Sequence, residues 1–259
     1  MLERGGCLCA AAASAPVWSG RVVSAALMPP PRHYAGASQP AIAENRPYAV
    51  AVDSMIRRHL PESRRRAILR PLAGSRMAIK STIFKAELQL ADLDRGHFSD
   101  YGLTLARHPS ETDERMMIRL LAFILHASPT LIFGRGLSTD DEADLWDIDA
   151  TGHVECWIDV GLPTERAIRR ACNSARKVVV VSYGGRAADL WWRQNCAKLV
   201  TLSNLRVLSL GAGDSQVLAR LAERNMHLQC TVQEGVVWLG NERQQIELTP
   251  TVLFSASPR

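Results

Sequence analysis

The sequence predicts an α/β fold, a mixed β-sheet flanked by helices. Three observations lead to this prediction. Residues 111–127 repeat apolar side chains at three- and four-residue spacing, which is typical of an amphipathic helix. Residues 177–185 begin with a continuous β-branched run, which indicates a strand buried on both faces of a sheet. Residues 141–161 alternate acidic and bulky apolar side chains, which indicates two short strands.

The first half of the domain is expected to hold strands around one helix. Residues 78–93 alternate polar and apolar side chains, and a second strand at 101–109 ends at Pro109. Ser110 then begins a pattern like a capping box, and the acids of the next turn favour the start of the 111–127 helix. A short strand followed by a turn is expected at 130–138, and two more strands are expected at about 143–148 and 153–160.

The second half alternates helices with strands and ends in a hairpin. A helix at 164–175 carries an exposed arginine face, and the buried strand 177–185 breaks at Gly184-Gly185 into another helix. The remaining elements are expected to be that helix at 186–200, a strand at 205–210, a helix at 215–224, and a hairpin from 226 to 249 that turns near Glu234-Gly235. This alternation indicates one α/β domain with a mixed sheet.

The chain divides into three predicted parts: residues 1–76, a domain at 77–250 and a C-terminal tail at 251–259. The first part is rich in Ala, Pro and Ser and holds eleven Arg, no Lys and four acids. Three interpretations fit it: translation from a misassigned start codon, a disordered basic arm, or a targeting segment. The lack of Lys ahead of Met77 favours the misassigned start.

The net charge of +5 and the pI near 9.1 suggest an anionic partner for this 259-residue chain. The excess of positive charge lies in residues 1–76, however, whereas residues 77–259 hold 20 basic and 22 acidic residues. The basic pI is therefore no evidence that the folded part binds nucleic acid. No apolar run approaches the roughly 18 to 20 residues that span a bilayer. Six scattered cysteines are interpreted as reduced thiols of a cytoplasmic protein.

The acids of residues 141–161 pose a physical problem. In the second of the two short strands, Glu155, Trp157 and Asp159 project from the same face. Two carboxylates facing a dry core would each cost several kcal/mol unless they were paired. We therefore expect this face to border a cleft. The alternative interpretations are a solvated acidic turn at 140–144 and the wet face of an edge strand for Glu155 and Asp159.

Long sequence motifs of the domain resemble the YaeQ family of bacterial proteins. The resemblance covers about residues 77–250 and begins at Met77, which supports the misassigned start. It is carried by "TLARHPSETDERMMIRLLAF" (104–123), "RGLSTDDEADLW" (135–146), "WIDVG" (157–161), "SYGGRAADLWW" (182–192) and "LQCTVQEGVVWL" (228–239).

This resemblance implies a PD-(D/E)XK nuclease-like core with added strands. The superfamily's Asp falls on Asp144, which follows Ala143 where many relatives have Pro, and its Glu falls on Glu155. These two carboxylates are the expected ligands of Mg²⁺ or Mn²⁺, which would polarise a phosphoryl oxygen and acidify a water. Asp159 joins Asp144 and Glu155 as a candidate catalytic residue.

The resemblance breaks at the lysine that usually follows two residues after the second acid, because Trp157 stands there. An indole can neither orient a water by charge nor offset developing negative charge. Three cations elsewhere in the sequence are candidates to replace it: Lys85, Lys177 and Arg119.

Two functions follow from these observations. One is a divalent-metal-dependent phosphodiester hydrolase without the usual lysine. The other is a catalytically degenerate module that binds nucleic acid or a protein such as a transcription component. The retained carboxylates favour the enzyme, while the missing lysine and the slightly acidic domain favour the binding module, because a nuclease normally has a basic channel for phosphates.

The domain boundary at Met77 gives a direct test. A chain that begins at Met77 is expected to unfold at the same temperature as the full chain, because residues 1–76 are predicted to carry no folded core. Differential scanning calorimetry of both chains measures this. A loss of several degrees in the shorter chain would contradict the boundary.

Overall fold

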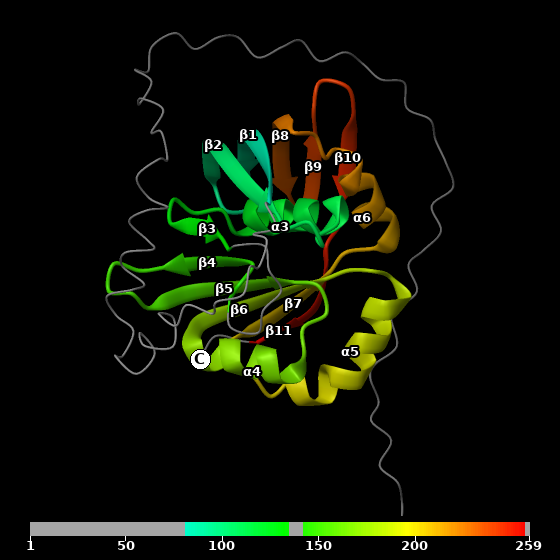
Figure 1. Cartoon of the computed structure of the whole chain (residues 1–259). Helices are drawn as coiled ribbons and strands as arrows, with labels where there is room; N and C mark the ends of the chain where they lie inside the picture. The colour runs from blue at the N-terminus through cyan, green and yellow to red at the C-terminus, as the bar shows by residue number, and fades with distance from the viewer. Residues whose placement is uncertain (1–80, 135–141, 257–259) are drawn as a thin grey trace, which may run out of the picture. The chain divides into compact units, whose positions relative to one another are not determined.

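The computed structural model describes residues 81–134 and 142–256. The predicted extension at 1–76 lies outside these residues, and so do Asp140 and Asp141 of the acidic turn. The described chain forms two mixed β-sheets with helices between and beside them, as Figure 1 shows. The α/β prediction is confirmed, but the prediction of a single sheet is wrong.

Sheet A holds the first two strands of the domain and three from its C-terminal part. The order is β10-β9-β8-β1-β2, with β8 parallel to β1 and every other pair antiparallel. The predicted hairpin at 226–249 gains a third strand, because residues 245–248 fold back onto the second. The bounds are β1 Thr82–Asp92, β2 His97–Arg107, β8 Asn225–Gln233, β9 Val236–Gly240 and β10 Gln245–Leu248.

Sheet B holds the acid-bearing strands and the buried β-branched run. The order is β11-β7-β6-β5-β4-β3, and β5, β6 and β7 are parallel. Residues 251–259 were predicted as a tail, but their described part forms the edge strand β11, which pairs with β7. The bounds are β3 Leu131–Phe133, β4 Leu145–Ile148, β5 Val154–Val160, β6 Ala175–Ser182, β7 Leu205–Ser209 and β11 Thr251–Ser255.

Helix α3 (Asp113–His126) lies between the two sheets (Figure 1). Its N-cap is Thr112 rather than the predicted Ser110, and the Thr112 hydroxyl accepts a hydrogen bond of 3.1 Å from the backbone N–H of Arg115. Every residue from Met116 to Ile124 is buried. A helix that is apolar on nearly all sides is stable only when it is covered on all sides, and the two sheets provide that cover.

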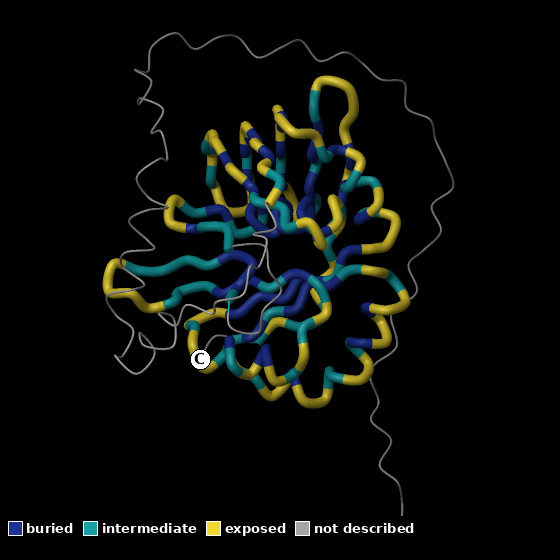
Figure 2. The backbone as a smooth tube through the Cα atoms, in the orientation of Figure 1, coloured by how far each residue is buried: buried dark blue, intermediate teal, exposed yellow. Residues whose placement is uncertain are grey.

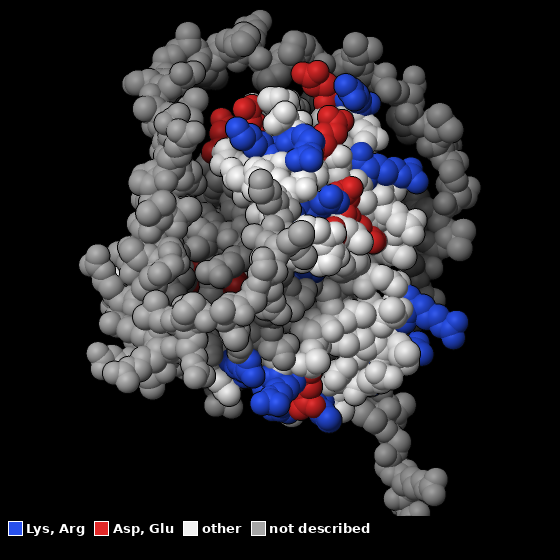
Figure 3. Space-filling model, viewed as in Figure 1, with Lys and Arg blue, Asp and Glu red and all other residues white. Residues whose placement is uncertain are grey.

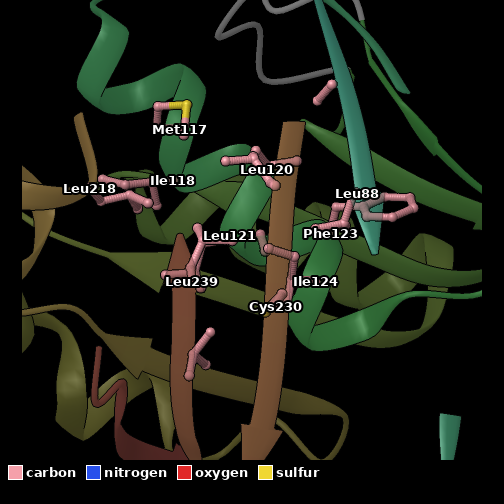
Figure 4. Packing of buried hydrophobic residues seen from close by; sticks show 14 of the residues in the cluster. Leu88, Met117, Ile118, Leu120, Leu121, Phe123, Ile124, Leu218, Cys230 and Leu239 are labelled. Atoms are coloured by element: carbon pink, nitrogen blue, oxygen red, sulfur yellow. The ribbon is translucent and has the colours of Figure 1, made fainter. Parts of the chain in front are cut away.

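The main core surrounds α3. Figure 4 shows Leu120, Leu121 and Ile124 of the helix beside Leu88 of β1, Cys230 of β8 and Leu239 of β9. The same core includes side chains of sheet B on the opposite side of the helix: Leu145, Ile158, Val160, Val179, Val181, Leu208 and Leu210. One buried helix therefore joins both sheets in a single hydrophobic core.

The other face of sheet B is covered by α4 (Glu165–Ser174) and α5 (Arg186–Leu199). Strand β6 lies between two covered faces and is buried from Val178 to Ser182, which Figure 2 shows in dark blue. Helix α6 (Ala212–Ala219) lies beside α3, where Ser215 Oγ donates a 2.6 Å hydrogen bond to Glu114 Oε1. No helix among the described residues is long and apolar enough to cross a membrane.

Candidate functional site

Asp144 lies immediately before β4 and is buried. Strand β4 begins one residue later, at Leu145. The carboxylate of Asp144 accepts a 2.8 Å hydrogen bond from the backbone N–H of Val160, on the neighbouring strand β5. Both of its oxygens also accept from Nη2 of Arg115, at 2.7 and 2.8 Å. The carboxylate is thus held by one strand and by α3.

Arg115 belongs to a buried network at the start of α3. Its Nη1 donates to Glu111 Oε1 at 2.9 Å. Arg119, which is fully buried, donates from Nε and Nη2 to the two oxygens of Glu111, at 2.9 and 3.0 Å, and from Nη2 to the carbonyl of Ala106 at 3.0 Å. Two guanidinium groups and two carboxylates therefore compensate one another inside the protein, which is the condition for burying any of them.

These ion pairs change the protonation equilibrium of Arg115. Burial alone would lower the pKa of this guanidinium, but the carboxylates of Asp144 and Glu111 outweigh burial and raise the pKa above its ordinary value. Arg115 therefore stays charged, and Asp144 has a permanent cationic partner.

Asp159 lies on β5 next to Asp144. Leu145 pairs with Ile158 in the antiparallel register, so the two acids lie side by side at the end of β5 where α3 begins. Asp159 Oδ1 accepts a 2.9 Å hydrogen bond from Nε1 of Trp157. Burial raises the pKa of Asp159, the charge of Asp144 raises it further, and together they bring it to about 7 although the indole bond opposes them.

Glu155 is not part of this group. It lies near the start of β5 and pairs with Arg176 Nε at 3.1 Å, in a pair whose arginine is 79% exposed. Five residues along a strand span roughly 16 Å, which separates Glu155 from the Val160 N–H that binds Asp144. The expected convergence of Asp144 and Glu155 is wrong, and Asp159 is the acid that the fold brings to Asp144.

The middle of the β5 face that carries these acids is packed against α4 and α5 rather than open. Trp157 is 6% exposed and packs in the second core beside Val178 and Trp191, under α4 and α5. It also contacts Trp146 edge-to-face, with ring centroids 5.7 Å apart. The acids avoid the cost of burial through specific partners: Asp159 accepts the Trp157 N–H, and Glu155 pairs with Arg176 at the exposed end.

The cation beside Asp144 was missed from the sequence. None of the three candidates, Lys85, Lys177 and Arg119, contacts Asp144: Lys85 lies on β1 in sheet A, Lys177 pairs in register with Cys156, and Arg119 binds Glu111. The four-residue spacing of Glu111, Arg115 and Arg119 was a usable signal, because it places all three on one side of a helix start.

Comparison with known proteins identifies close relatives. The family model described as "YaeQ protein" matches residues 77–250. Over 175 residues, the protein named "Uncharacterized protein YaeQ" is 46% identical in Escherichia coli (strain K12) and 47% identical in Salmonella typhi. The Escherichia coli alignment covers 68% of this chain and 97% of the relative.

Two solved structures share the fold. The crystal structure of YaeQ protein from Xanthomonas axonopodis pv. citri matches with a TM-score of 0.66 and 46% identity, and covers 68% of this chain and 99% of that one. The crystal structure of YaeQ protein from Pseudomonas syringae matches with a TM-score of 0.65 and 34% identity, and the match covers 68% of this chain and 97% of that one. The family resemblance noted in the sequence is thereby confirmed.

The raised pKa of Asp159 predicts a pH-dependent stability. The folded value of about 7 lies above the ordinary 3.8, so the folded protein binds the extra proton between these values and loses stability as pH rises through them. Asp159→Asn, which cannot ionise, is expected to gain stability relative to the wild type between pH 5 and pH 8. Urea unfolding of both proteins at several pH values measures the difference.

Trp157→Phe provides the matched comparison. It removes the N–H that favours the charged form of Asp159, so the pH-dependent loss of stability is expected to become larger than in the wild type. A stability difference between Asp159→Asn and the wild type that stays constant from pH 5 to pH 8 would show that Asp159 titrates in its ordinary range.

Proposed function

This chain belongs to the YaeQ family, and we propose that it is a nucleic-acid-binding module with a nuclease-like fold, in which an arginine has taken the place of a catalytic metal. The observation that carries the proposal is the contact of Arg115 with both oxygens of Asp144. The same guanidinium is shared with Glu111, so it forms part of the buried network at the start of α3.

The residues as arranged do not fit Mg²⁺ or Mn²⁺. Such ions need free carboxylate oxygens, and those of Asp144 already accept three hydrogen bonds. Asp159 is half protonated near pH 7, and Glu155 lies at the other end of the strand. Among the described residues, no group of three or more His, Cys, Asp or Glu side chains is placed to hold a metal ion.

A basic surface on α4 and α5 supports nucleic acid as the partner. Residues 165–174 and 186–199 hold six Arg and Lys against two acids, a balance of +4, although residues 77–259 as a whole have two more acids than bases. Figure 3 shows blue side chains gathered over α4 and beside α5. Positive charge is thus concentrated on one part of the domain, although the domain as a whole has a slightly negative net charge.

Some of these cations are already neutralised and others are not. Glu165 binds Arg169 at 2.8 Å and Lys198 at 2.7 Å, which ties α4 to α5. Three exposed arginines, Arg166, Arg186 and Arg193, have no ion pair with any described acid. Arg186 and Arg193 are two turns apart on α5 and therefore point to similar sides of the helix. Such unpaired guanidinium groups are suited to phosphate oxygens.

The proposal predicts salt-sensitive binding to short RNA and DNA. Three arginine–phosphate contacts should give a slope of about −2 to −3 for log K against log salt concentration. The triple variant Arg166→Glu, Arg186→Glu and Arg193→Glu is expected to weaken binding tenfold or more, because it replaces three attractive charges by repulsive ones. Fluorescence anisotropy with labelled single- and double-stranded oligonucleotides measures both quantities.

A charge-matched control separates the basic surface from overall charge. Lys85→Glu, Arg220→Glu and Arg243→Glu make the same change of charge at exposed positions outside residues 165–206, and this variant is expected to bind almost as the wild type does. Equal weakening by both variants would contradict the assigned surface. No binding to any oligonucleotide at low salt would overturn the nucleic-acid proposal and leave a protein partner.

Metal-dependent phosphodiester hydrolysis is the second candidate, and the adjacency of Asp144 and Asp159 favours it. Hydrolysis would require Arg115 to leave Asp144. Binding of Mg²⁺ or Mn²⁺ with a Kd of about 10 to 200 μM would stabilise the protein by about 1 to 3 kcal/mol at millimolar metal.

The absence of a metal effect is the expected result. Isothermal calorimetry and thermal unfolding with each ion, in the wild type and in Asp144→Asn with Asp159→Asn, measure the effect. A metal-dependent stabilisation that the double variant abolishes would favour the hydrolase over the proposed binding module.

A further inference from the structure

A second polar group lies at the opposite end of α3, away from the Arg115 network. Asp147 of β4, Cys156 of β5 and Lys177 of β6 are paired in register across sheet B, on the face that α3 covers. Arg206 of β7 is paired with Val179, two residues further along β6, on the same face. His126 is the last residue of α3, and Ser128, two residues later, binds Asp147 of this row, so the end of α3 lies over the row.

Positive charge dominates the part of the row beneath His126. Burial lowers the pKa of His126, and the nearby charges of Lys177, Arg206 and Arg95 lower it further, to about 3. Two of these cations belong to sheet B, and the third belongs to the turn between β1 and β2. The imidazole is neutral, so its N–H is available as a hydrogen-bond donor.

Two acids lie in this region, Asp92 and Asp147, and each has a partner of its own. Arg95 binds Asp92 at 2.5 Å and donates to the carbonyls of Ile124 and Ala127, which end α3. Asp147, at the far end of the row, accepts a 2.9 Å hydrogen bond from Ser128 Oγ.

Two nitrogens of the group have no partner among the described residues. Nε2 of His126 and Nε of Arg206 are buried and make no hydrogen bond there. Unpaired buried donors are costly, and a protein normally satisfies them. Lys177 is exposed and has no ion pair with a described acid, so its ammonium group is available to an anion.

We propose that Lys177, Arg206 and His126 form a binding site for a small phosphate-class oxyanion, either inorganic phosphate or a phosphomonoester. Lysine and arginine contribute charge and charge-assisted hydrogen bonds, and His126 contributes a neutral donor at the inner side. A tetrahedral oxyanion has enough acceptor oxygens for donors that converge from α3, β6 and β7. The site lies on the α3-covered face of sheet B, so it is separate from the basic surface of α4 and α5 and does not depend on the function proposed for that surface.

The probe is inorganic phosphate, added to the full chain at constant ionic strength with chloride in the reference sample. Histidine side-chain NMR is expected to show one imidazole whose resonances move in a saturable way with phosphate, and which is absent from His126→Gln. Isothermal calorimetry gives the affinity. Glucose 6-phosphate, tested in parallel, distinguishes a phosphomonoester site from one for the free ion.

Lys177→Gln is the main variant, because Lys177 is exposed and the substitution removes no core packing. It is expected to weaken phosphate binding about tenfold or more, the loss that accompanies removal of a charge-assisted hydrogen bond. Lys85→Gln removes another exposed lysine, from sheet A, and is expected to leave the affinity unchanged.

Two results would overturn the site. One is the lack of any saturable shift of the His126 resonances up to about 10 mM phosphate, the range of a weak specific site. The other is equal weakening by Lys177→Gln and Lys85→Gln, which would reveal general screening of charge by an adventitious ion only. Retention of phosphate binding in Arg166→Glu, Arg186→Glu, Arg193→Glu is expected, because those arginines lie on α4 and α5.

Discussion

The burial of α3 on every side is the constraint on which the rest of the structure depends. A helix between two sheets has no solvent-facing side to receive polar residues, yet α3 carries Arg115 and Arg119 in its first two turns. Each guanidinium must find its partner inside the protein, since an unpaired buried charge costs several kcal/mol. Glu111 meets this need from the loop before the helix, and Asp144 meets it from sheet B. Asp144 is therefore a structural counter-ion for α3.

Local patterns in the sequence were sufficient for most elements and insufficient for their assembly. The β-branched run of β6 and the turn at Glu234-Gly235, where both residues have positive φ, are encoded by neighbouring residues. The division into two sheets is not encoded in this way. It rests on the pairing of β1 with β8, which are far apart in the chain, and no periodicity within either strand indicates that partner.

For the candidate site, too, local patterns in the sequence were insufficient. Asp144 and Asp159 are adjacent in the hairpin between β4 and β5, but the turn at residues 149–153 does not by itself set this pairing. A count outward from the turn would place Ile158 opposite Asp144, and a β-bulge between Asp147 and Ile148 shifts the pairing by one residue. The sequence does not indicate that bulge. The contact of Arg115 with Asp144 joins residues on separate elements, and its geometry depends on how α3 packs on sheet B. Only the three-dimensional arrangement could reveal that contact.

The interior position of β1 in sheet A, between β8 and β2, has a consequence for how the chain acquires its structure. Strand β1 ends at Asp92 and is flanked by β2 on one side and by β8, which begins at Asn225, on the other. During synthesis the β1–β2 hairpin and α3 emerge early, but the strands that complete the cover of α3 emerge near the end of translation. Until then the apolar side chains of α3, which are buried in the folded protein, are exposed to other chains. Contacts between such distant segments also slow folding, because a long loop must close before they form. The nascent protein is therefore prone to aggregation until the last strands of sheet A have emerged.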